Sequence, residues 1–167
     1  MFPISVAGTV RLKMGVPVTD AMVRAACDRI ADMLDEAMAG SSAADNVRIE
    51  GNTVHFYAAW FALRWNWNFL APFDKGQIIV ELHRNAIAIR YTLSTVNMLL
   101  LITSVLAAIG AFVVWGKPDI LKEVRTIAPY LGLGWLWLFG MNYLIGMIRA
   151  PLWLRRGLRK DPELRKR

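Results

Sequence analysis

Two long stretches without a charged residue constrain this chain more than any other feature. They cover residues 91–115 and 126–148. A helix needs about 20 consecutive apolar residues to cross a hydrocarbon core of roughly 30 Å, and each stretch is long enough. The rest of a chain of 167 residues is too small to bury two helices that are apolar all round. The sequence therefore predicts a transmembrane hairpin, with spans at residues 93–115 and 127–149.

The distribution of Lys and Arg predicts the orientation of the hairpin. Residues 149–167 carry eight Lys or Arg and only two Asp or Glu, whereas residues 1–92 are neutral overall. Basic residues collect on the cytoplasmic side of membrane spans. We therefore expect the basic tail, residues 150–167, and the domain of residues 1–92 in the cytoplasm. Residues 116–126 then form a short external connector.

The basic tail is the first candidate binding surface. It directly follows a predicted span, so the phosphates of anionic lipids are nearer than nucleic acid, and we expect Arg155 and Arg156 to contact headgroups. The N-terminus has no signal-peptide pattern. The single cysteine, Cys27, excludes an intramolecular disulfide and suits a reducing compartment. We expect a bacterial cytoplasmic (inner) membrane protein that crosses twice.

Residues 1–92 have the pattern of an α+β domain. Apolar and polar residues alternate from Ile4 to Lys13, which predicts a half-buried strand. After Thr19, a predicted helix N-cap, apolar residues recur every three or four positions up to a break near Gly40. This spacing predicts one amphipathic helix, with Cys27 on its apolar face.

Four further strands follow as two predicted hairpins. Each hairpin has a two-residue turn: residues 47–50 and 53–60 around Gly51-Asn52, and residues 77–83 and 86–93 around Arg84-Asn85. The order β-α-β-β-β-β predicts an antiparallel sheet with the single helix on one face. Because the last strand runs almost directly into the first span, we expect the sheet close to the membrane.

An aromatic stretch separates the two predicted hairpins. Within residues 60–76, aromatic residues stand on both sides of Arg64 in the sequence. The candidate membrane-interface residues are Trp60, Arg64, Trp65 and Trp67. Trp is enriched at the interface because its ring is apolar and its N–H stays hydrated. Packing of these rings on the sheet and a groove for a partner protein remain open alternatives.

The predicted spans carry further candidate site residues. Aromatic side chains stand near the four ends as candidate interfacial anchors: Tyr91, Trp115, Tyr130 and Trp153. Small or amide side chains in the second span are candidates for helix packing: Gly132, Gly140, Asn142 and Gly146. We expect this span to pack on the first span or on another subunit.

No pattern in the sequence predicts catalysis, a cofactor or a metal. His55 and His83 lie on predicted polar faces, but a zinc site needs three or four ligands, and Glu81 or Glu50 would have to complete it. Cys27 lies on the apolar face of its helix, away from any base. No P-loop, HExxH, CxxC or nucleophile-elbow pattern occurs.

The function expected from these features is that of a non-catalytic accessory or assembly subunit. Its cytoplasmic domain would dock a protein partner, and its hairpin would pack against the spans of that partner. One alternative is a homo-oligomeric channel or carrier, with Asn97 or Asn142 on a common axis. A second alternative is a membrane-surface enzyme that acts on lipid headgroups with His55, His83 and Glu81.

Overall fold

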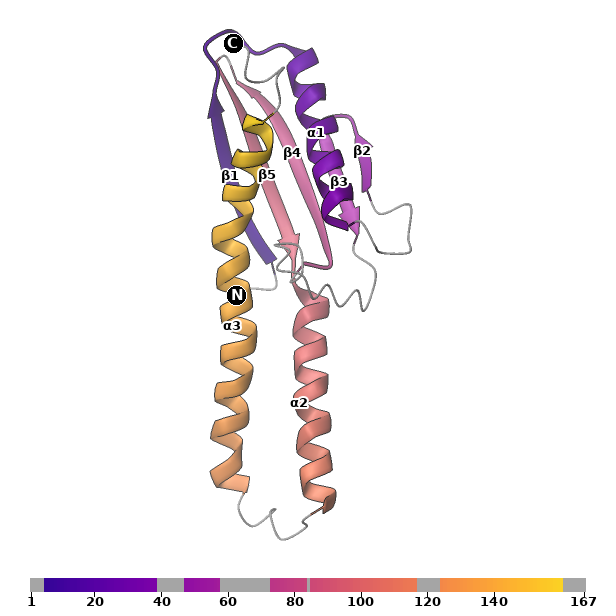
Figure 1. The fold of residues 1–167 in the computed structure, drawn as a ribbon, viewed down its shortest axis with the longest axis vertical. Coiled ribbons are helices and arrows are strands. Elements are labelled where there is room, and N and C mark those ends of the chain that lie inside the picture. The colour runs from indigo at the N-terminus through magenta and orange to yellow at the C-terminus, as the bar shows by residue number, and fades with distance from the viewer. Residues whose placement is uncertain (1–4, 39–46, 58–72, 84, 117–123, 161–167) are drawn as a thin grey trace.

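The computed structural model describes residues 5–38, 47–57, 73–83, 85–116 and 124–160 (Figure 1). A five-stranded sheet forms one end of the molecule, and two long helices extend from it (Figure 1). The elements follow in the order β1 (Ser5–Lys13), α1 (Asp20–Met38), β2 (Val47–Glu50), β3 (Thr53–Tyr57), β4 (Lys75–His83), β5 (Ala86–Ser94), α2 (Val96–Gly116) and α3 (Val124–Arg159).

All strands of the sheet pair antiparallel, in the spatial order β1-β5-β4-β3-β2. The turns of the β2–β3 and β4–β5 hairpins fall where the sequence predicts them. The N-terminal strand β1 pairs with β5, the last strand, and so lies at one edge. The predicted α+β fold with an antiparallel sheet is confirmed.

One face of the sheet carries the hydrophobic core. Alternate residues of the strands point into it, among them Val10, Ile89, Val80 and Phe56, which are at most 1% exposed. Helix α1 covers this face with its apolar side, as its three-and-four spacing predicts. Helix α1 begins after Thr19, whose carbonyl accepts hydrogen bonds from the first turn.

Two strand glycines leave room for aromatic rings of the core. Gly8 pairs with Tyr91 across β1 and β5, and the Tyr91 ring lies where a Gly8 side chain would be. Gly76 pairs with Phe56, and a Cβ at Gly76 would lie 2.7 Å from Phe56 Cζ. These contacts fix large side chains against the sheet.

Helix α3 is longer than the sequence predicts. The second span is predicted to end at residue 149, followed by a basic tail, but the helix continues to Arg159 and its last turns join the domain (Figure 1). Ala150, Leu154 and Leu158 are at most 2% exposed and belong to the same core as α1 and the sheet. Their spacing of four places them on one helix face. The domain therefore has two covering helices, α1 and the end of α3.

Candidate functional site

The two long helices form an apolar hairpin, consisting of α2 and residues 124–148 of α3. Val96–Val113 and Ala128–Arg159 are long and apolar enough to cross a membrane, by length and composition. The large apolar side chains of the hairpin are mostly exposed, and among them Trp115 is 89% and Tyr130 71% exposed. Trp115 belongs to the end of α2 and Tyr130 to the start of α3, and these are the helix ends that lie farther from the sheet (Figure 1).

A line of aromatic rings connects the hairpin to the sheet. Trp135 Nε1 donates a hydrogen bond of 3.1 Å to Thr103 Oγ1 on α2. Phe139 stacks on Trp135 at a centroid distance of 5.3 Å, and Tyr143 follows at 6.2 Å. The Tyr143 hydroxyl donates to the Ser5 carbonyl of β1 at 3.3 Å. Sequence reasoning missed this line, although the spacing of four between the rings is visible in the sequence.

The predicted packing residues have different surroundings. A Cβ on Gly132 or Gly140 would meet no atom within 4 Å, so neither glycine packs against α2. Gly146 lies under the ring of Phe73, and a Cβ there would come within 2.6 Å of Phe73 Cζ. Gly146 therefore packs, but against the domain rather than against the first helix. The side chain of Asn142 lies outside the described part of the chain.

The aromatic residues predicted to lie at the membrane interface also differ in their surroundings. Tyr91 lies in β5 and is only 5% exposed, so its ring belongs to the core rather than to the end of an apolar helix. Burial raises the pKa of its hydroxyl. Trp153 is half-buried and packs against the core. Outside the described residues lie Trp60, Arg64, Trp65 and Trp67.

Cys27 lies where its helical spacing predicts, on the core face of α1. It is 1% exposed. Burial raises the pKa of the thiol from its ordinary 9.0 to about 11, and the negative charge of Asp28 adds to this shift. A thiol with this pKa is protonated at neutral pH, so Cys27 is a core side chain and not a nucleophile.

The end of α3 carries basic side chains along β1. Arg155 and Arg156 are exposed and lie six and seven residues beyond Arg149, about 9 to 10 Å farther along the helix axis. Close packing against α1 fixes this part of the helix, because Gly157 lies directly against the side chain of Met33. The two arginines therefore stand beside the sheet on a rigid support.

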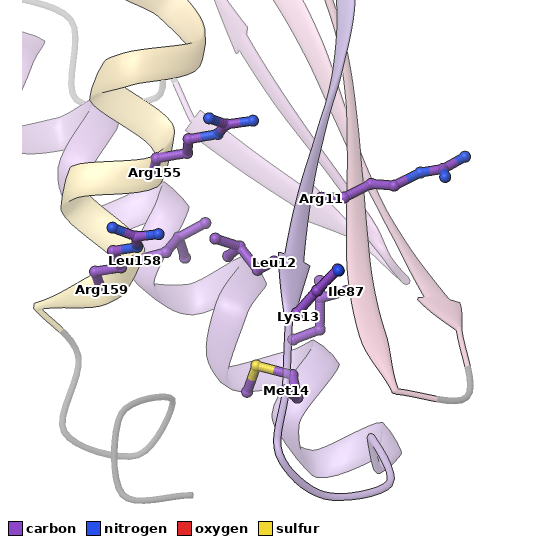
Figure 2. Close-up of a pocket in the computed structure, with 8 residues that line it drawn as sticks. All are labelled: Arg11, Leu12, Lys13, Met14, Ile87, Arg155, Leu158 and Arg159. Carbon is purple, nitrogen blue, oxygen red and sulfur yellow. The ribbon is translucent and has the colours of Figure 1, made fainter.

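A basic groove lies between β1 and the last turns of α3 (Figure 2). Its volume is about 340 Å³, and its cations are Arg11 and Lys13 from β1 with Arg155 and Arg159 from α3. All four side chains are exposed, and none has an ion pair with another described residue. We refer to these four residues together with the apolar floor below as the basic groove.

The floor of the basic groove is apolar. Leu12 and Leu158 face each other from β1 and α3, and Ile87 lies on β5 opposite Leu12 (Figure 2). Ile87 and Leu158 are at most 1% exposed and are part of the core. The groove thus combines a cationic rim with a rigid hydrophobic base. Sequence reasoning named Arg155 but did not place Arg11 or Lys13 beside it.

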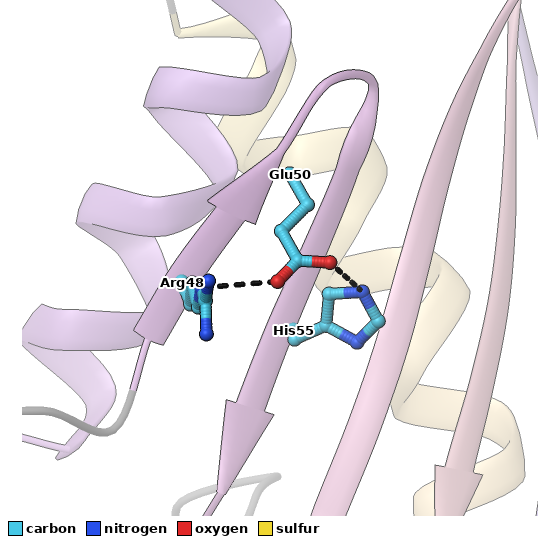
Figure 3. Close-up of polar contacts among 3 residues, drawn as sticks. All are labelled: Arg48, Glu50 and His55. Atoms are coloured by element: carbon cyan, nitrogen blue, oxygen red, sulfur yellow. Dashed lines mark ion pairs between the residues drawn. The ribbon is translucent and has the colours of Figure 1, made fainter.

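The other face of the sheet is polar and uncovered by any described element. On it, Arg48 Nε lies 3.0 Å from Glu50 Oε1, and His55 Nε2 lies 3.9 Å from Glu50 Oε2 (Figure 3). Glu81 forms a second ion pair with Arg90 at 3.1 Å. Exposed pairs of this kind contribute at most about 1 kcal/mol each.

The residues of the enzyme alternative do not form one site. His55 pairs with Gln77 of β4, and His83 is six residues farther along that strand, a separation of about 20 Å. Within the described residues no group of three His, Cys, Asp or Glu side chains is arranged to hold a metal ion. The geometry therefore gives no support to joint catalysis by His55, His83 and Glu81.

Comparisons with protein-family models, with curated proteins and with solved structures found no match for this chain.

Proposed function

We propose that this protein is a non-catalytic docking subunit of a larger complex in a bacterial cytoplasmic membrane. In this proposal the apolar hairpin lies in the bilayer with the partner's own spans. The α+β domain stands on the cytoplasmic surface and binds a protein partner there. The observation that carries the proposal is the continuity of α3, which is at once the second apolar helix and a part of the domain core.

The hairpin has the dimensions that the membrane part of the proposal requires. From Tyr130 to Arg149 the helix rises by about 28 Å, close to the thickness of a hydrocarbon core of roughly 30 Å. Exposed apolar side chains cover this length, and an aromatic ring stands at its outer end. The basic residues beyond Arg149 favour the cytoplasmic side for the domain.

The connection between hairpin and domain is short and stiff at both helices. Only Thr95 separates β5 from α2, and its side chain is buried. Helix α3 enters the core without interruption and buries Leu154 and Leu158 there. A flexible linker would let a domain search a volume, whereas this connection holds the domain at one height and one angle. Fixed presentation of this kind suits docking onto a neighbour in the same membrane.

The outward glycines of the hairpin favour contact with other helices. A Cβ added to Gly132 or Gly140 would have no atom of the described residues within 4 Å, so among these residues nothing covers the backbone at either position. Small residues permit close approach between helices in a membrane. This surface would pack on the spans of the partner.

The test is native mass spectrometry of the tagged protein, extracted gently from its own membrane. Recovery with unlike chains in fixed stoichiometry is the expected result. A matched pair of variants then locates the contact: Gly140→Leu should reduce the recovery of those chains, and Met141→Leu on the same helix should not. Recovery of this protein alone, as a monomer or as a ring of copies, contradicts the proposal, and the ring would favour the channel alternative.

A further inference from the structure

We propose that the basic groove binds an extended segment of a partner protein in which acidic and apolar side chains alternate, added as a sixth strand beside β1. This inference rests on the proposed docking function and names the chemistry of the docked segment. Four observations carry it: the edge of β1 from Thr9 to Lys13, with which no described strand pairs, the cationic rim, the apolar floor, and the height of the groove above the hairpin.

The outer edge of β1 offers backbone groups for a further strand. The Met14 N–H donates to the Asn85 carbonyl at 2.9 Å, so residue 14 directs its backbone toward β5. Backbone direction alternates along an antiparallel strand, and the N–H and C=O groups of Lys13, Arg11 and Thr9 therefore point away from β5. The Ser5 carbonyl also points away from β5, as this alternation requires, and it accepts a hydrogen bond from the Tyr143 hydroxyl of α3. No described strand pairs with this edge.

The rim of the groove selects negative charge. Arg11 and Lys13 lie on the open-face side of β1, and Arg11 extends away from α3, whereas Arg155 and Arg159 belong to α3 on the other side of the strand (Figure 2). Arg155 also borders the hollow on the open face together with Arg11, and the third arginine there, Arg90, is paired with Glu81. Guanidinium groups bind carboxylates with two parallel hydrogen bonds, so closely spaced arginines favour carboxylates on the ligand.

The floor of the groove explains why the acidic side chains must alternate with apolar ones. Side chains of an added strand point in turn to the two faces of the sheet. On the core side they meet the partly buried Leu12, and on the open side they meet Arg11 and Lys13. The edge from Thr9 to Lys13 is about 13 Å long, which accommodates about four residues of an extended segment.

The height of the groove favours a protein ligand over a lipid headgroup. The headgroup layer is about 5 to 8 Å thick on each side of a bilayer. Arg155 and Arg159 stand about 9 and 15 Å beyond Arg149 along α3. An anionic segment that approaches from the cytoplasm reaches the groove directly.

The experiment measures binding of a fluorescent peptide, Glu-Val repeated four times, to the full-length protein in phosphatidylcholine nanodiscs. Fluorescence anisotropy should show saturable binding that weakens as salt is raised. The double variant Arg11→Glu plus Arg155→Glu should weaken binding at least about tenfold. Arg156→Glu, the same charge change on the next residue of α3, does not border the groove and should bind as the original chain does.

Two control peptides separate charge from strand pairing. Lys-Val repeated four times has the same pattern with opposite charge and should not bind. A Glu-Val peptide methylated at alternate backbone nitrogens keeps its charge but loses the pairing edge, and it should bind at least about tenfold more weakly. If the double charge reversal disturbs folding, the neutral pair Arg11→Gln plus Arg155→Gln replaces it, since exposed substitutions of this kind change stability by about 0.5 kcal/mol or less.

Several results would overturn the inference. They are an absence of peptide binding at millimolar concentrations, equal binding by the Lys-Val peptide, or equal binding by the double variant. Displacement of the peptide by ATP at lower concentration than by unlabelled peptide would assign the groove to phosphate ligands instead. If the peptide fails while unlike chains still co-purify, only this inference fails. If the peptide binds while no unlike chain is recovered, the docking function fails and the groove assignment stands.

Discussion

At the scale of single residues, Gly76 is a position where one added carbon would meet buried core side chains. A Cβ there would lie 2.7 Å from both Phe56 Cζ and Leu93 Cδ2, and both of these side chains are at most 2% exposed. We expect Gly76→Ala to lower the free energy of unfolding by about 1–3 kcal/mol, because neither neighbour can move without disturbing the core. Guanidinium unfolding in detergent, followed by tryptophan fluorescence, measures the difference.

Gly132→Ala is the control for this substitution. The new methyl group meets no atom within 4 Å on an exposed helix position, so stability should stay the same or rise slightly. Equal stability of the Gly76 and Gly132 variants would contradict the close packing between β3, β4 and β5.

The raised pKa of the Cys27 thiol predicts a loss of stability at high pH. The unfolded chain loses the thiol proton near pH 9.0, whereas burial in the folded chain raises the pKa to about 11. The unfolded state therefore releases its proton first. The contribution of this thiol to the free energy of unfolding is fully present below pH 9 and is lost as the pH rises toward 11.

We expect unfolding free energies measured between pH 8 and pH 10 to be steady at first and then to fall, with a smaller fall for Cys27→Ala. Burial also raises the pKa of the Tyr91 hydroxyl, so this group lowers the unfolding free energy further above its ordinary pKa of 10.0. The comparison is therefore best made below that pH. A decline that is identical in the original chain and in Cys27→Ala would contradict the buried position of the thiol.

At the scale of elements, the sequence predicts what depends on neighbouring residues and misses what depends on distant ones. The alternation in β1, the three-and-four spacing in α1 and the two-residue turns predict six of the domain elements within a few residues. Residues 150–159 mix apolar and basic side chains, and the prediction weighed only their charge. The basic groove joins Arg11 to Arg155 through the β1–β5 pairing and the packing of α3, which no local spacing encodes.

The part of α3 that enters the core should be necessary for the stability of the domain. Leu154 is 2% exposed in the core, and Leu152, on the same helix, is 45% exposed. We expect Leu154→Ala to lower the unfolding free energy by about 2–5 kcal/mol and Leu152→Ala to lower it by much less. Near-ultraviolet circular dichroism during thermal unfolding reports the difference. Similar losses for both variants would contradict the packing of α3 on the sheet.

At the scale of the whole molecule, the proposed topology predicts which surfaces water-soluble reagents can reach from outside the cell. In a Cys27→Ala background, Asp119→Cys lies in the connector between the helices, and Arg48→Cys replaces a side chain that is 76% exposed on the domain. A membrane-impermeant maleimide should label the first variant in intact cells and the second only after permeabilisation. The reverse pattern would place the domain outside, and labelling of both in intact cells would argue against a membrane-spanning hairpin.

The entry of α3 into the core has a consequence for synthesis of the protein. The strands and α1 leave the ribosome first, but Ala150, Leu154 and Leu158, which complete the core, come after both apolar helices. The nascent domain therefore waits, with its apolar sheet face partly open, until the second helix has been made. If the hairpin crosses a membrane as proposed, a chain that failed to insert would carry its last core residues on a helix prone to aggregation. In the proposed topology, insertion of the hairpin and completion of the domain are therefore coupled, and chains that fail expose the apolar surface that chaperones and proteases recognise.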